Sequence, residues 1–157
     1  MKNAERKQQL VDVLQSQLAC SKSLLQCLES ERIGLTTRNL EQIEQSTRDK
    51  LGLTQTLEQL DARRTSLLND LGYSSNARGM HQCIVELPET KPLWLHILEN
   101  LSACRNSNLT NGAILESGRQ QAEQALTVLR GQHNSPKLYN TEGNTRPNFG
   151  NRELGKA

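Results

Sequence analysis

The sequence predicts an all-α protein, an elongated antiparallel bundle of three long helices and one short helix with a disordered C-terminal tail. Apolar or small residues recur at alternating steps of three and four from residue 94 to residue 129, which places them on one face of a helix. Hydrophobic residues make up 34% of the chain and aromatic residues only 3%, which suits Leu-lined helices better than a β-sandwich. Residues 132–157 are rich in Asn, Gly, Pro and Thr, a composition typical of disorder. We therefore expect a helical domain over residues 1–131 and a flexible tail over 132–157.

The first two predicted helices form a hairpin. Residues 3–33 keep the three-four rhythm through Leu14, Leu18 and Leu25, and Gly34 is the expected C-terminal stop. Asn39, with Gln42 three residues later, resembles a capping box and begins a second helix that ends before Gly72. Because the connection between them is short, the two helices should be antiparallel neighbours.

The second half of the domain is predicted as a short helix and a long one. Ser75 is the expected cap of the short helix, which ends near Glu86, before a proline. Thr90 is the expected cap of the long helix, which continues to about Arg130. The dipeptide at 111–112, Asn-Gly, favours a hairpin instead. The periodicity keeps its phase across this point, so we predict one continuous helix.

Composition argues against several functional classes. Residues 1–130 carry fifteen Lys or Arg and fifteen Asp or Glu, so no basic footprint for nucleic acid is expected. No apolar run is long enough to span a membrane and the N-terminus shows no secretory signal. The four cysteines match no zinc pattern, and we expect them to be reduced packing residues. No motif for catalysis or for a cofactor is found, so we expect neither.

The long helix offers the candidate binding surface. Its seam consists of Trp94, Ile97, Leu101, Cys104, Asn108, Asn111, Leu115, Gly118, Ala122, Ala125 and Leu129. The first half is expected to pack inside the bundle, whereas small residues alternate with leucine in the second half and form a shallow surface for a partner helix. Asparagines within the seam could set the register. The candidate cargo-binding residues are Asn108, Asn111, Ile114, Leu115, Gly118, Ala122, Ala125, Leu126 and Leu129. Internal packing of the whole seam remains the simpler alternative.

Two groups of residues resemble a known family. The helical part contains Arg64-x-x-Leu67-Leu68-x-x-Leu71-Gly72, then Trp94, then Cys104-Arg105-Asn106-x-Asn108-x-x-Asn111-Gly112-x-Ile114-Leu115. The tail contains Leu138-Tyr139-Asn-Thr-Glu-Gly143 and ends Leu154-Gly155-Lys-Ala. Together these residues resemble the FlgN family, cytosolic export chaperones for flagellar hook-associated proteins, over nearly the whole chain. A filament-cap chaperone, which shares the helical architecture, matches the Asn-Gly run and the tail less well.

The resemblance implies partners and a docking residue. Its C-terminal half would bind the helical ends of the hook–filament junction proteins FlgK and FlgL in the cytoplasm. Tyr139 matches the tyrosine through which the family docks on the cytosolic domain of the export-gate protein FlhA. Four basic tail residues could steer that docking. A different interpretation is a coiled-coil structural or adaptor protein that self-associates through the same seam and carries no secretion cargo.

Overall fold

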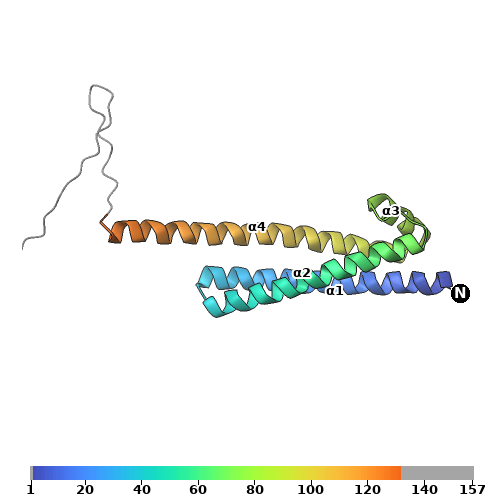
Figure 1. Ribbon diagram of the computed structural model, residues 1–157, viewed down its shortest axis with the longest axis horizontal. Helices are drawn as coiled ribbons and strands as arrows, with labels where there is room; N and C mark the ends of the chain where they lie inside the picture. Colours follow the sequence, from blue (N-terminus) through green and yellow to red (C-terminus); the bar gives the residue numbers. More distant parts are fainter. Residues whose placement is uncertain (1, 132–157) are drawn as a thin grey trace, which may run out of the picture. The chain divides into compact units, whose positions relative to one another are not determined.

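The computed structural model describes residues 2–131, and these residues form four helices (Figure 1). They are α1 (Lys2–Thr37), α2 (Leu40–Asp70), α3 (Ala77–Glu86) and α4 (Thr90–Leu129). No strand occurs within this range, so the predicted all-α fold of three long helices and one short helix is confirmed. The expected tail, residues 132–157, lies outside the described residues.

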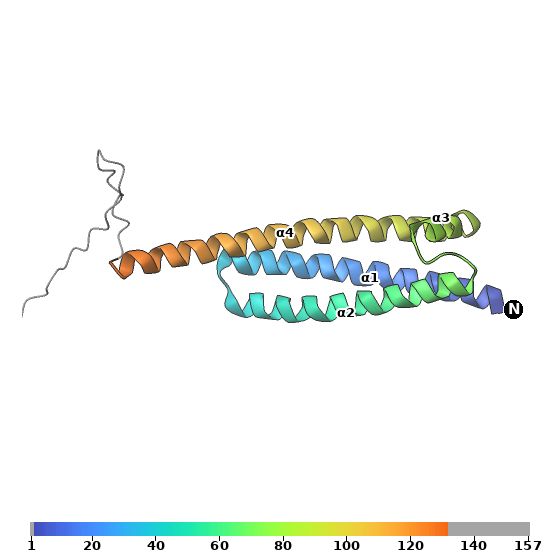
Figure 2. The same ribbon diagram turned by 45° about the horizontal axis from the view of Figure 1, so that its top comes forward.

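Residues up to Gly118 form one compact unit, in which α1 lies between α2 and the first part of α4. Helices α1 and α2 form the predicted antiparallel hairpin, and α3 connects α2 to α4 (Figure 2). The α4 helix runs parallel to α1, since Cys104 lies beside Ser21 and Asn111 lies beside Leu28. Both pairs are 83 residues apart in the chain, so the two helices keep one register across two turns.

The core of this unit has two parts. The larger cluster joins α1, the end of α2, α3 and the start of α4, and its fully buried members include Leu14, Leu68, Met80 and Ile97. The smaller cluster lies farther along the helices and consists of Leu24, Leu28 and Cys104, with Leu53 and Leu57 partly buried beside them. Helix α3 closes the first cluster but does not extend over the second.

Two helix ends confirm the sequence-based expectations. The Asn39 side chain accepts a hydrogen bond from the Gln42 backbone N–H at 3.2 Å, as an N-cap should. Gly72 follows α2 with φ of 87°, the left-handed conformation that favours glycine. The α4 helix is continuous through Gly112, so the hairpin signal at residues 111–112 does not decide the local structure.

Two expected boundaries are wrong, by up to four residues. Gly34 does not end α1, which runs on to Thr37, and Arg38 makes the turn with φ of 56°. Gly34 instead lies where the hairpin helices approach closely, because a Cβ there would be 3.1 Å from Ile43 Cγ1. The cap of α3 is Asn76 rather than Ser75.

Thr90 does not cap α4 with its side chain. Its hydroxyl donates to the Leu87 carbonyl at 2.7 Å, whereas an N-cap oxygen accepts from the helix. The residue is fully buried at the start of α4. Its hydroxyl is therefore satisfied by the chain that precedes the helix.

Candidate functional site

The structure divides the predicted seam of α4 into two lines with different surroundings. Ile97, Cys104 and Asn111, spaced by seven residues, are all buried. Leu101 and Asn108 belong to the second line and are exposed. The first line packs on α1, and the second faces the space between α4 and α2. A single seam in the sequence therefore supplies two different surfaces.

Asn111 belongs to the interior of the bundle. Its Nδ2 atom donates to the Leu28 carbonyl and to Glu31 Oε2, both at 2.8 Å. Only 3% of the residue is exposed. The structure therefore places Asn111 in the contact between α1 and α4 and leaves its side chain little surface to offer a partner.

Glu31 extends this contact to α2. Lys50 Nζ donates to Glu31 Oε1 at 2.6 Å and lies 3.5 Å from Asn108 Oδ1. The Glu31 side chain is 9% exposed and that of Lys50 is 28% exposed. One ion pair and two asparagines thus connect all three long helices, and the buried carboxylate is compensated by both a cation and an amide.

The remaining candidate cargo residues of α4 lie on its exposed part. Ile114 is half-buried, and the others, including Gly118, Ala122 and Ala125, are exposed. Leu115, Leu126 and Leu129 are exposed by 61%, 48% and 82%. Side chains this apolar are costly to leave in water when they share one helix face. Tyr139, the expected docking residue, lies outside the described residues.

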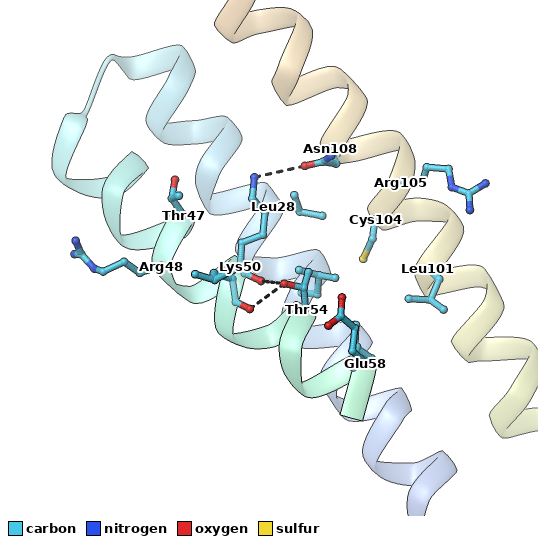
Figure 3. A pocket seen from close by; sticks show the side chains of 13 residues that line it. Leu28, Thr47, Arg48, Lys50, Thr54, Glu58, Leu101, Cys104, Arg105 and Asn108 are labelled. Atoms are coloured by element: carbon cyan, nitrogen blue, oxygen red, sulfur yellow. Dashed lines mark hydrogen bonds between the residues drawn. The ribbon is translucent and has the colours of Figure 1, made fainter. Parts of the chain in front are cut away.

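A groove between α2 and α4 is the main feature that sequence reasoning missed. It has a volume of about 810 Å³, with Leu24 and Leu28 of α1 as its floor. Leu51 and Leu57 come from α2. Thr54 of α2 and Leu101, Cys104 and Asn108 of α4 complete the lining on the two sides (Figure 3). The periodicity identified most of these residues as helix-packing positions. It could not show that α2 and α4 stand apart at this level and leave Leu51 and Leu101 exposed.

The four cysteines are free and buried, as expected. The Cys27 thiol donates to the Ser46 carbonyl at 3.1 Å, and the Cys20 thiol donates to the Leu53 carbonyl at 3.5 Å. Burial raises the pKa of both thiols, and at Cys27 the nearby Asp49 and Glu31 raise it further. These thiols are therefore protonated packing groups of the α1–α2 interface rather than nucleophiles.

Residues 2–131 contain neither a metal-binding cluster nor a membrane-spanning helix. No cluster of three or more His, Cys, Asp or Glu side chains there could hold a metal ion. None of the helices in this range combines the length and the apolar character needed to cross a bilayer. What the described surface does offer is a groove and an exposed helix face, both of which suit binding to another helix.

Comparison with known proteins identifies the family. A family model described as FlgN protein matches residues 1–147. Comparisons with curated proteins and with solved structures found no match. FlgN proteins are chaperones rather than enzymes, and hook-associated proteins of the flagellum are the kind of partner they bind. Since the match covers all four helices and most of the chain, this protein belongs to the FlgN family of flagellar export chaperones.

Proposed function

We propose that this protein is a cytoplasmic chaperone that binds the C-terminal helical segments of FlgK and FlgL, prevents their premature assembly and delivers them to the export gate. The proposal is based on the exposed apolar face of α4. Leu115, Leu126 and Leu129 share that face with Gly118 and Ala122, and all five are exposed. Small residues between leucines allow a second helix to approach closely.

The exposed apolar stripe of such a cargo is complementary to this surface. A helical segment that is designed for a coiled coil cannot bury its apolar stripe while it is alone, so it tends to aggregate. The α4 face would cover that stripe until export. Ordering a flexible segment subtracts from the affinity, which keeps the complex reversible, as release for secretion requires.

We assign delivery of the cargo to the tail because the tail resembles that of the family. Tyr139 would insert into the cytosolic domain of FlhA, because a tyrosine offers a large apolar ring with few torsions to restrict. Residues 131–157 carry four basic and two acidic side chains, and this excess would steer the tail to an acidic surface. Loss of FlhA binding in Tyr139→Ala, with the cargo affinity unchanged, is the expected result. Unchanged FlhA binding would remove Tyr139 from the proposal.

Calorimetric titration with the C-terminal helical segment of FlgK or FlgL tests cargo binding directly. Wild-type protein should give a saturable one-to-one curve, and the double variant Leu126→Asp, Leu129→Asp should weaken binding at least about 100-fold because two leucines that the cargo would cover become charged. The matched control is Val85→Asp, Leu109→Asp, since these residues are 69% and 67% exposed and lie off the stripe. Circular dichroism should show that both variants stay helical. Equal binding by both variants would reject this face as the cargo site.

A further inference from the structure

We propose that the groove between α2 and α4 is a second helix-binding site, which takes one amphipathic helix of a partner protein with acidic residues beside its apolar stripe. Two contacts join α2 to α4. Outside the lining of the groove, the Arg64 guanidinium lies 5.0 Å from the centre of the Trp94 ring. Within the lining, Lys50 Nζ lies 3.5 Å from Asn108 Oδ1. Between these contacts α2 and α4 leave an apolar surface uncovered, with α1 as its floor.

The walls of the groove offer little hydrogen bonding to a ligand. The Thr54 hydroxyl donates within its own helix, at 2.9 Å from the Lys50 and Leu51 carbonyls (Figure 3). The Thr47 hydroxyl likewise donates to Ile43 at 2.8 Å. Both threonine hydroxyls are therefore satisfied within α2, and Leu51 and Leu57 of the same helix line the groove beside them. Such a surface binds through apolar burial, which a helix with one leucine stripe can supply.

The length of the groove fits a short helix. Its lining on α2 extends from Thr47 to Glu58, which at the α-helical rise corresponds to about 16 Å, or about three turns. Three helices around an open apolar space leave the position of a fourth vacant, and four helices enclose such a core in a bundle. The fitting ligand is thus about three turns of helix rather than a small molecule or an extended strand.

Positive charge at the rim of the groove favours a helix that carries acidic residues. Arg48 of α2 and Arg105 of α4 both line the groove, and their side chains extend along the outer sides of the two helices (Figure 3). Neither arginine forms an ion pair among residues 2–131. Arg48 donates a hydrogen bond to the neutral side chain of Gln45. Lys50 is already paired with Glu31, and Glu58 is the one acidic residue of the lining. Two unneutralised arginines favour carboxylates on the docked helix.

The same observations disfavour occupants from this chain. Residues 132–157 carry a net charge of +2, the same sign as the two rim arginines. The exposed end of α4 in a second copy would present Gly118, Ala122 and Ala125 between its leucines, and these small side chains would leave much of an 810 Å³ space unfilled. A partner helix with larger apolar residues and acidic flanks fits both the volume and the charge. The proposal does not depend on the export role.

Two synthetic peptides test the site on the full-length protein. Both are three-turn amphipathic helices with one leucine stripe, flanked by Glu in the first peptide and by Lys in the second. Fluorescence anisotropy should show that the Glu peptide binds at least about tenfold more tightly than the Lys peptide. Exchanging both rim arginines, Arg48→Glu with Arg105→Glu, should abolish or reverse this preference. Equal affinity of the two peptides for the wild type would overturn the charge selection.

A matched pair of variants locates the binding. Leu51 lines the groove and is 61% exposed, whereas Leu109 does not line it and is 67% exposed. Leu51→Glu should weaken the Glu peptide about tenfold or more because it places a charge in an apolar contact, and Leu109→Glu should leave the affinity unchanged. Both changes are at exposed positions, so both variants should remain folded. An equal effect of the two variants would reject the groove.

Methyl NMR of the wild-type protein distinguishes a partner helix in the groove from the tail or a second copy of the protein. Peptide-induced shifts of the Leu51, Leu57 and Leu101 methyl groups support the proposal, and shifts confined to Leu126 and Leu129 overturn it. In the free protein, nuclear Overhauser contacts from Leu51 to residues 132–157 would assign the groove to the tail. Concentration-dependent shifts of Leu51 without peptide would assign it to a second copy. The FlgK and FlgL titration uses different variants, so failure of either proposal is separately visible.

Discussion

At the scale of single residues, a buried polar link specifies how α4 sits on α1. Asn111 donates to Leu28 and Glu31, and Lys50 neutralises Glu31 from α2. An apolar seam alone would tolerate a shift of one heptad, because each leucine would meet another apolar residue. A buried amide and carboxylate lose their partners in any shifted register. The polar link therefore favours one arrangement of the three helices.

Removing the Asn111 amide should reduce stability. Asn111→Ala deletes two buried hydrogen bonds, one of them to a carboxylate, and we expect the free energy of unfolding to fall by about 1–3 kcal/mol. Asn106→Ala is the control, because Asn106 is exposed on the same helix and its change should raise stability by about 0.5 kcal/mol through helix propensity. Urea denaturation measures both. Equal effects would contradict the role assigned to Asn111.

Because its thiols are buried, the protein should lose stability at alkaline pH. Burial raises the pKa values of Cys83 and Cys104. The nearby Glu86 raises that of Cys83 further. In the unfolded chain these thiols lose their protons above about pH 8.5, while the folded state keeps them. The stabilisation is complete below that pH and is lost as the pH rises toward the folded-state pKa values. Tyr73 acts in the same direction at higher pH, since burial and its hydrogen bond to Glu86 raise its pKa to about 12.

We therefore expect the free energy of unfolding to be lower at pH 10 than at pH 8. Urea titrations at the two pH values measure the difference. In Cys27→Ala with Cys83→Ala the difference should shrink, because two of the thiols with raised pKa values no longer titrate. A fall of the same size in the wild type and the variant would show that other groups cause it.

At the scale of helices and loops, three glycines that all lie within helices have different roles. A Cβ on Gly79 would lie 1.8 Å from the Ser74 carbonyl oxygen, so the loop before α3 can close only over glycine. A Cβ on Gly112 or Gly52 would meet nothing within 4 Å. These last two glycines lie inside long helices, where the missing side chain only weakens the helix.

Substitution of Gly79 should therefore be strongly destabilising. Gly79→Ala forces Ser74 and its neighbours to move, and we expect a loss of about 2–4 kcal/mol in the free energy of unfolding. The loop precedes a helix whose Met80 and Cys83 are fully buried, so the displacement reaches the main core. Thermal unfolding followed by circular dichroism checks the prediction. An unchanged melting temperature would mean that the loop closes without this contact.

Gly112→Ala tests the continuity of α4. Because the helix passes through residue 112 without a break and the added methyl group meets no neighbour, the change should stabilise the protein by about 0.5–1 kcal/mol. A helix that broke or turned at Asn111-Gly112 in solution would instead be destabilised, since alanine is poor in a turn that needs positive φ. The sign of the change in urea denaturation decides between these structures.

At the scale of the whole molecule, a family chaperone and a self-associating adaptor respond differently to concentration. A ligand that binds only the folded state raises its stability by mass action, by about 2.7 kcal/mol at 100 times its Kd. On the proposed function, the melting temperature should rise with added FlgK or FlgL segment and stay constant over a wide range of the protein's own concentration. Differential scanning fluorimetry measures both series. A melting temperature that rises with protein concentration alone supports self-association through α4.

Much of the fold could be predicted because it depends on local spacing. The helix cap at Asn39, the stop at Gly72 and the persistence of α4 through Gly112 all follow from short-range chemistry or from periodicity. The end of α1 was less predictable. Gly34 suits both a helix stop and a close helix crossing, and only the position of Ile43 next to it decides for the crossing.

The sequence by itself determined the all-α class, the order of the helices and the family, because periodicity, caps and motifs are written in neighbouring residues. Only the tertiary structure decided which line of the α4 seam is buried. Ile97, Cys104 and Asn111 contact α1, whereas Leu101 and Asn108 face the groove. Both lines have the same heptad spacing, so the choice depends on which of them packs on α1. That packing consists of contacts between residues distant in the chain, such as Cys104 with Ser21 and Asn111 with Leu28, which no local pattern encodes.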